Sequence, residues 1–493
     1  MIGAARRQGN AMKTLIQGGT VVGFDGAGHE ILKHGVVVLD GDTVEFVGFA
    51  HPGPVDVTID ARGKLVSPGF VNLHIHAMGN AGDYFLNDPG KTDFFGANYL
   101  TYLTPRKGAK GPQGLEDFRV GGKFALVQAM RNGSTTIQVY GGGAEGGDEF
   151  VAMVGDLGLR AYLGPSYRNA NFSFEDTGAL RYVWDDALGE RGLQQAVAFI
   201  KKHRGTHNGR IQGMLYPRQI DTCTPELLQK TKVAARELGV GIQIHAAMNL
   251  IEFHQILQHY GKTPIAHLHR LGFLGPEVIL GHCVFLTGHS WTALPRGDDL
   301  GIIADSGASA SHSPVKYAKY GMVWESLDRY LARGINVGLG TDTYPMDMVH
   351  EMRMASLTCR FAERDYLAGS YRDAFNAATL GGARALGRSD LGRLCAGAKA
   401  DLFIANITKT EYGAIFDPIK AFVEYGSGRD IETVIVDGRT VLEGGRLVGV
   451  DETALLAQVQ AEAERIWSKI PEWDFLGRRA DEISPWAFPL RKA

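Results

Sequence analysis

The chain has 493 residues, more than one ordinary hydrophobic core accommodates, so we expect one large domain with a smaller one attached. Hydrophobic residues make up 44% and charged residues 21%, as in soluble globular proteins, and a net charge of −3 gives no reason to expect a nucleic-acid partner. No apolar run is long enough for a transmembrane helix, the first ten residues lack the apolar region of a secretory signal, and four scattered cysteines indicate reduced thiols in a cytoplasmic protein.

Residues 12–67 are expected to form a small all-β module. Short runs rich in Val, Ile and Thr alternate there with turns that contain Gly or Asp, the pattern of short strands. The predicted strands are 14–17, 20–23, 35–39, 44–48 and 57–60.

From residue 68 to 396 the pattern changes to strand, turn and helix, repeated. Eight short β runs, apolar on both faces, alternate with helical stretches, which is the number of strands in a (β/α)8 barrel. The predicted strands are 70–76, 135–140, 159–165, 211–216, 241–246, 278–284, 301–308 and 336–341, and the clearest helices are 187–203, 225–238 and 323–333.

Residues 397–450 return to short strands, at 402–405, 432–436 and 439–442. We expect them to complete the first module, so that the barrel is inserted into a composite β-sandwich. Residues 451–493 are predicted to form a tail, helical over 452–467. The tail then becomes irregular and carries Trp473, Phe475, Trp486 and Phe488; we expect this segment to pack on another surface, such as a second subunit of a homo-oligomer.

Two histidines, His74 and His76, stand at the end of the first predicted barrel strand. Residues two apart in a strand point to the same face, so the two imidazoles can bind one metal ion. Parallel α/β folds place their chemistry at this carboxyl end of the strands. Each histidine alone could equally be a hydrogen-bonded core residue.

Three further metal-capable side chains follow apolar strands: His245 after the fifth, His282 after the sixth and Asp342 after the eighth. Each alone has a structural interpretation, and a Thr-Asp after Gly is often only a helix cap. In a barrel, however, all of these residues converge at one face with the histidine pair. The sequence therefore predicts a metal site there.

At these motifs the sequence resembles the amidohydrolase superfamily. The matching segments are Pro-Gly-Phe-Val-Asn-Leu-His-Ile-His at 68–76, the strand-end residues above, Ala-Thr-Leu-Gly-Gly-Ala-Arg-Ala-Leu-Gly at 378–387 and Gly-Arg-Leu-Cys-Ala-Gly-Ala-Lys-Ala-Asp-Leu at 392–402. The segment Ser-His312-Ser-Pro-Val resembles the seventh-strand motif of the triazine-hydrolase and cytosine-deaminase branch. The resemblance covers about residues 12–450.

The resemblance implies that His74, His76, His245 and Asp342 bind one divalent metal ion, with His282 beside a bound water. Three imidazoles and a carboxylate suit Zn²⁺ best, and also Fe²⁺, Mn²⁺ or Co²⁺. Binuclear relatives use a lysine on the fourth strand, where this chain has none, so one metal is expected.

The chain departs from its branch at Met248. Deaminases of the branch have His-x-x-Glu after the fifth strand, and that glutamate moves protons; here the sequence is His245-Ala-Ala-Met248. A missing general acid costs about 10²–10⁴ in rate, which counts against attack on a heterocyclic ring. Glu252, one helical turn further on, is an alternative acid but is expected to lie farther from the metal.

The substrate is predicted to be a small molecule, apolar or aromatic. A long segment after the first strand, 77–115, is rich in aromatic residues and fits either a lid packed on itself or an aromatic wall over the substrate. Two arginines, Arg168 and Arg218, follow the third and fourth strands and either bind a carboxylate or pair with an acid. The candidate substrate-binding residues are Tyr84, Phe85, Arg168, Arg218, Met248 and His312.

The sequence thus predicts a metal-dependent hydrolase that cleaves a C–N or C–S bond of an amide, urea or (thio)carbamate. The metal lowers the pKa of its water, Asp342 takes the proton and His282 stabilises the oxyanion. Without the glutamate, the chain resembles the branch that includes phenylurea and thiocarbamate hydrolases. The alternatives are a deaminase or dechlorinase of a triazine, pyrimidine or purine-like ring, and a non-catalytic scaffold of the same fold.

Overall fold

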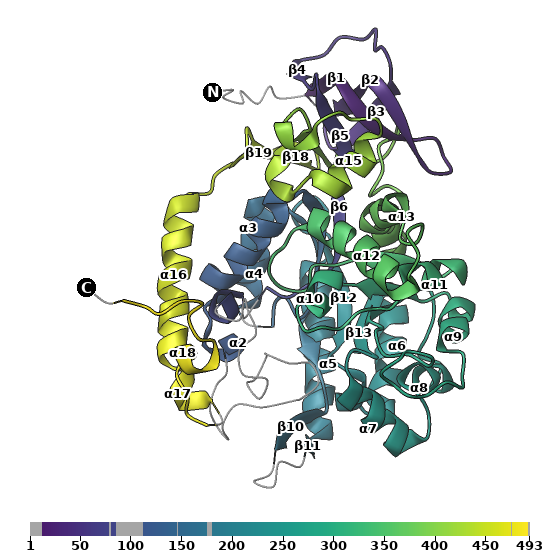
Figure 1. The fold of residues 1–493 in the computed structure, drawn as a ribbon, viewed down its shortest axis with the longest axis vertical. Coiled ribbons are helices and arrows are strands. Elements are labelled where there is room, and N and C mark those ends of the chain that lie inside the picture. Colours follow the sequence, from purple (N-terminus) through teal and green to yellow (C-terminus); the bar gives the residue numbers. More distant parts are fainter. Residues whose placement is uncertain are drawn as a thin grey trace.

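Two large sheets organise the chain in the computed structural model, which describes residues 12–77, 80–84, 112–144, 146–174, 180–474 and 476–491 (Figure 1). The first sheet is mixed and joins the two ends of the chain, because β5 pairs antiparallel with β17. Its strands are β1 (Lys13–Phe24), β2 (His29–Asp40), β3 (Thr43–Gly48), β4 (Val57–Asp60), β5 (Lys64–Pro68), β17 (Leu402–Asn406), β18 (Ile431–Val436), β19 (Arg439–Glu443) and β20 (Arg446–Leu447). The composite module expected from the sequence is therefore confirmed. The runs 14–17 and 20–23 form one continuous strand, β1, with irregular pairing around Gly19.

The second sheet is the parallel barrel, and its strand order follows the sequence from β6 to β16. Its strands are buried on both faces because helices surround them, as the continuous apolar runs predicted. They are β6 (Phe70–Ile75), β7 (Ser134–Val139), β8 (Arg160–Leu163), β12 (Ile211–Pro217), β13 (Gly241–Ala246), β14 (Val278–His282), β15 (Ser309–His312) and β16 (Val337–Leu339). A short β9 (Ser166–Tyr167) extends the β12 edge, and β10 (Ala170–Phe174) and β11 (Leu180–Trp184) form a hairpin.

The barrel closes between its first and last strands. Asp342, just past β16, pairs in parallel with Ile75: its amide donates to the His74 carbonyl (2.8 Å), and its carbonyl accepts from the His76 amide (2.6 Å). A side chain on Gly340 would lie 2.7 Å from the His74 main-chain nitrogen, so glycine is needed for this approach. The (β/α)8 barrel predicted from the sequence is confirmed.

The prediction for the seventh strand is wrong. Residues 301–308 lie in and just past helix α9 (Asp299–Ser306), and the seventh strand is β15, further along the chain. The Asp298 side chain caps the helix by accepting from the Gly301 amide at 3.0 Å, and Gly307, with φ +74°, ends it. The true strand has the sequence Ser-Ala-Ser-His, which lacks the β-branched residues that usually mark a strand.

The predicted helices 187–203 and 225–238 are confirmed as α5 (Asp186–His203) and α6 (Pro225–Leu238), whereas 323–333 contains only the short α11 (Leu327–Ala332). The other helices around the barrel and in the tail complete the fold. They are α1 (Asn80–Asp83), α2 (Pro112–Leu115), η2 (Phe118–Gly122), α3 (Lys123–Arg131), α4 (Gly147–Leu157), η3 (Ile220–Thr222), α7 (Leu250–Tyr260), α8 (Pro264–Arg270), α10 (Pro314–Ala318), α12 (Met348–Glu363), α13 (Tyr371–Asn376), η4 (Ala377–Gly381), α14 (Gly382–Ala385), η5 (Thr410–Tyr412), α15 (Pro418–Tyr425), η6 (Gly428–Asp430), α16 (Glu452–Ser468), α17 (Ile470–Trp473) and α18 (Ala480–Ile483).

The C-terminal tail returns to the barrel, where α16 lies along the side that carries α3 and α4 (Figure 1). The Trp467 indole donates to the Gly82 carbonyl at 2.7 Å, and the Glu462 carboxylate accepts from the Asp117 amide at 2.8 Å. The tail therefore holds the chain at Gly82 and at Asp117.

The aromatic end of the tail divides into a buried and an exposed part. Trp473 is only 1% exposed and packs with Ile470 and Ile483 of its own chain, whereas Trp486 and Phe488 are 65% and 83% exposed. Phe475 lies outside the described residues. The expected contact with a second subunit stays a prediction.

Among the helices that the structure describes, none combines the length and the apolar character needed to cross a bilayer.

A buried ion network joins the barrel to the mixed sheet. Arg160, the first residue of β8, donates to the Asp401 carboxylate at 2.9 Å and to the Asp437 carboxylate at 2.8 Å, and all three side chains are almost fully buried. Because Arg160 stands at the amino end of its strand, the sheet meets the barrel at the end away from the strand-end histidines.

Replacement of Arg160 by methionine should destabilise the protein by about 3–5 kcal/mol, because two buried carboxylates would lose their counter-charge. The measurement is the apparent melting temperature, compared with that of Arg62→Met at an exposed ion pair. We expect a clear decrease for the first variant and none for the second; equal melting temperatures would contradict this role of the network.

Candidate metal centre

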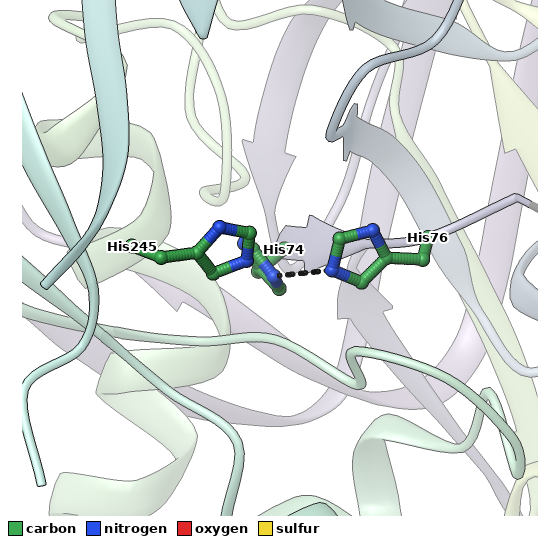
Figure 2. A group of neighbouring side chains, drawn as sticks. All are labelled: His74, His76 and His245. Carbon is green, nitrogen blue, oxygen red and sulfur yellow. Dashed lines mark hydrogen bonds between the residues drawn. The ribbon is translucent and has the colours of Figure 1, made fainter. Parts of the chain in front are cut away.

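Five side chains meet at the carboxyl end of the barrel, and we call them the strand-end cluster: His74, His76, His245, His282 and Asp342. Nε2 of His74 lies 3.2 Å from Nε2 of His76, and Figure 2 shows the His245 ring on the other side of His74. The Asp342 carboxylate lies 3.9 Å from Nε2 of His76 and 3.7 Å from Nε2 of His282. The structure thus brings together all five residues that the sequence singled out.

Hydrogen bonds fix which ring nitrogen of two histidines faces the centre. The Gln243 amide nitrogen donates to the Leu73 carbonyl (2.9 Å), so its oxygen accepts a hydrogen bond from Nδ1–H of His74 (2.9 Å). Nδ1 of His245 donates to the Arg218 carbonyl at 2.7 Å. In each ring Nε2 is left with a lone pair, as a metal ligand requires.

The cluster fits a divalent metal ion. Donor atoms of His74, His76 and His245 lie within 4.8 Å of one another, and so do those of His74, His282 and Asp342. Two nitrogens bound tetrahedrally to one Zn²⁺ lie about 3.3 Å apart, close to the spacing of the His74 and His76 nitrogens. Both Asp342 oxygens are buried without a hydrogen-bond partner among the described residues, so a cation would compensate them.

Burial keeps the imidazoles neutral. It lowers the pKa of His76 to about 3, and the pKa values of His74, His245 and His282 also fall below the ordinary value. Burial alone would raise the pKa of Asp342, but the charge of Lys316 and then the histidines outweigh it, and the pKa ends below its usual value. The centre therefore offers neutral nitrogens and a carboxylate, the donor set that Zn²⁺ prefers.

Two members of the cluster have left-handed backbones, Asp342 with φ 60° and His282 with φ 78°. Such conformations are costly for non-glycine residues and persist where neighbours enforce them. The main-chain bonds at the barrel closure hold Asp342. The Trp324 indole donates to the His282 carbonyl at 2.5 Å and so holds the backbone at His282.

The main chain around Met248 is held by Glu252. The glutamate is fully buried, and its two oxygens accept from the Ala247 amide (2.6 Å) and the Met248 amide (3.0 Å). The Tyr317 hydroxyl donates to the Met248 carbonyl at 3.0 Å. Both carboxylate oxygens of Glu252 are therefore engaged by the turn that follows His245.

The candidate substrate residues do not form one group in the structure. Tyr84 stacks on Tyr344 with ring centroids 4.4 Å apart, so the long segment 77–115 contributes one ring of an aromatic pair. His312 stacks on Trp324, with ring centroids 4.1 Å apart. Phe85 and the rest of the segment to residue 111 lie outside the described residues.

The two arginines lie close enough to influence each other. Burial, and then the charge of Arg218, lower the pKa of Arg168 to about 9. Arg168 has no acidic partner among the described residues.

Sequence reasoning missed two polar residues here. Gln243 orients His74, and its signal was its place two residues before His245, on the same face of a buried strand. Lys316 on α10 donates to the Thr343 hydroxyl at 3.0 Å, next to Asp342. Nothing local in the sequence marks Lys316, because the pairing of β15 with β16 creates its proximity to Asp342.

Comparisons with known proteins agree with this architecture. Residues 65–441 match the amidohydrolase family. A 5'-deoxyadenosine deaminase of Methanosarcina mazei is 29% identical over 461 residues, covering 92% of this chain and 99% of that protein. A 5-methylthioadenosine/S-adenosylhomocysteine deaminase of Moorella thermoacetica is 30% identical over 457 residues, covering 91% and 98%.

Two solved structures share the fold. An adenosine deaminase of Xanthomonas campestris with bound zinc matches with a TM-score of 0.77 at 21% identity, covering 93% of this chain and 99% of that one. A triazine hydrolase of Arthrobacter aurescens matches with a TM-score of 0.75 at 24% identity, covering 92% and 99%.

Replacement of Gln243 by leucine should weaken metal binding about 10–100-fold, because His74 would lose the partner that fixes its ring and its proton. The measurement is the zinc affinity of the metal-stripped protein by competition with a chelator. Gln212→Leu, on the neighbouring strand β12, is the control and should bind zinc like the wild type. Unchanged affinity of the Gln243 variant would contradict the orienting role.

Acidification should destabilise the fold through His312. Burial lowers the pKa of His312 to about 3, whereas the unfolded chain binds this proton near pH 6.5. Between these values the unfolded state holds the extra proton, so stability falls as the pH falls. The melting temperature of His312→Phe should therefore decrease less than that of the wild type between pH 7 and pH 4.5; equal slopes would contradict the assignment.

Proposed function

The chain belongs to the amidohydrolase family, and on that premise we propose that it hydrolyses the acyl C–N or C–S bond of an amide, a urea or a (thio)carbamate. The resemblance drawn from the motifs is confirmed, and with it an enzyme that acts on C–N bonds and a site for a divalent metal. The precise substrate and the bond cleaved are our proposal.

The observation that carries the proposal is the lack of a free acid after β13. Methionine at 248 cannot move a proton, and both oxygens of Glu252 are engaged by the Ala247 and Met248 amides. Attack on a heterocyclic ring benefits from protonation of a ring nitrogen, a contribution of about 10²–10⁴ in rate. An acyl carbon needs no such acid at a ring position.

We propose His74, His76, His245 and Asp342 as the ligands of one divalent ion, most simply zinc. When bound, the ion polarises the scissile carbonyl and makes water a stronger nucleophile. The Asp342 carboxylate accepts the proton of the attacking water and returns it to the leaving atom. Neutral His282 has no partner at Nδ1 among the described residues, so we place its proton on Nε2, which faces Asp342 and donates to the oxyanion.

We further propose a substrate with an aromatic or apolar body. The Tyr84–Tyr344 stack supports an aromatic wall beside the strand-end cluster. The buried Arg168 guanidinium favours a substrate that also carries a carbonyl or carboxylate group, so charged and uncharged substrates should both be tested.

A second candidate is a deaminase or dechlorinase of an N-heterocycle, as the sequence analysis allowed. It is favoured by the curated deaminases, which match about nine-tenths of the chain. This function requires Glu252 to leave two backbone amides, or another acid to take its place. The non-catalytic scaffold is disfavoured by the complete set of metal-capable residues.

The deciding experiment measures products. Wild-type enzyme loaded with zinc should release an amine or thiol from anilides, phenylureas and thiocarbamates faster than it releases ammonia from aminotriazines, cytosine or adenosine-type nucleosides. Asp342→Asn should be inactive on every substrate while its melting temperature in the metal-free state stays near that of the wild type. Met248→Glu should increase ammonia release relative to amine release.

Rapid ammonia release by the wild type, with a kcat/KM above that for every acyl substrate, would establish the second candidate instead. Metal analysis that finds no bound zinc after loading would return the scaffold to consideration.

A further inference from the structure

A lysine lies beside the strand-end cluster at the junction between the ends of β15 and β16. Lys316 follows the Ser-Pro turn after His312, and its ammonium donates to the Thr343 hydroxyl at 3.0 Å. Thr343 is the residue after Asp342, so the lysine reaches across from α10 to the loop that carries the carboxylate. Its side chain is half-buried, which weakens the solvent screening of its charge.

The ammonium of Lys316 lies close enough to the strand-end cluster for its charge to act on four of the five members. It is the first of the charges that lower the pKa of Asp342, and it contributes to the lowered pKa values of His74, His76 and His282. A fixed positive charge beside Thr343 therefore favours negative charge that develops close to it.

Cleavage of an acyl bond creates negative charge at two points. The carbonyl oxygen becomes an oxyanion as water adds, and the leaving nitrogen or sulfur takes the electron pair of the breaking bond. In the proposed mechanism, the metal, when bound, and His282 would stabilise the negative charge on this oxygen. The leaving atom has no acid from the Met248 position, because Glu252 is engaged elsewhere.

We propose that the Lys316 ammonium stabilises the negative charge that develops on the leaving nitrogen or sulfur. Water adds to the carbonyl carbon, the bond to the leaving atom breaks, and Asp342 carries the proton from the water to that atom. Lys316 transfers no proton; it acts through its charge and through one hydrogen bond from its ammonium to the leaving atom. The identity of the leaving atom rests on the proposed function; the charge role itself does not.

A purely structural role makes a different prediction. If Lys316 only holds Thr343 and thereby the loop of Asp342, Thr343→Val should reproduce every effect of losing the lysine. If Lys316 acts by charge, Thr343→Val should retain most activity, and Lys316→Arg should retain more than Lys316→Met.

The test uses zinc-loaded full-length enzyme and a series of anilides whose anilines differ in basicity. For Lys316→Met we expect kcat to fall about 10²–10³-fold with the most basic aniline and less than tenfold with nitroaniline, since the better leaving group needs less stabilisation. KM should stay within about threefold, and zinc content, measured by mass spectrometry, should be unchanged. Lys230→Met removes a lysine from an exposed ion pair with Glu190 and serves as the control, with kcat within about twofold.

Three results would overturn the inference: kcat of Lys316→Met within about threefold of the wild type, an equal loss for all anilides, or a loss matched by Thr343→Val or by lower zinc content. If Lys316→Met does not fold, Lys316→Gln replaces it under the same criteria. If the wild type releases only ammonia, the proposed function fails separately. The charge role is then decided by whether Lys316→Met lowers kcat for deamination by about tenfold or more at full zinc content, with Thr343→Val active.

Discussion

The pairing of β6 with the chain just past β16 is the constraint on which the rest of the structure depends. Two main-chain hydrogen bonds between the Asp342 peptide and the residues around Ile75 close the barrel. The same bonds hold Asp342 in a left-handed backbone conformation and place its carboxylate beside His76. Barrel closure and assembly of the metal centre are therefore one event. Because the buried carboxylate gains no donor from the described protein groups, the closed barrel favours a cation.

Much of this could be predicted from the sequence, because its signals are local. An apolar strand that ends in a polar residue predicts both a barrel strand and a site residue. For His74, His245 and His282 the strands are confirmed, and the side chains meet in the strand-end cluster. The seventh strand could not be recognised, since Ser-Ala-Ser-His becomes a strand only through its neighbours. Lys316 was missed for a related reason: its partner Thr343 lies 27 residues further along the chain, and the two meet only where β15 pairs with β16.

The fold is shared with an adenosine deaminase and a triazine hydrolase, so it does not by itself identify the reaction. What bears on the reaction is the placement of protons and charges around the strand-end cluster. On one side, the turn after His245 carries methionine, and its glutamate is engaged by backbone amides. After β15, two strands further round the barrel, Lys316 extends toward the loop that carries Asp342. In the proposed mechanism, a fixed ammonium takes the place of a proton-carrying acid in stabilising the leaving atom.

The mixed sheet has a further consequence for how the protein is made. β5 needs β17 as its neighbour, and more than three hundred residues separate the two strands in the chain. During synthesis the first module emerges with its inner edge unpaired, and it stays so until the whole barrel has been translated. A ribosome that stalls within the barrel would therefore leave an open strand edge, which is a surface that chaperones bind and on which partial chains aggregate.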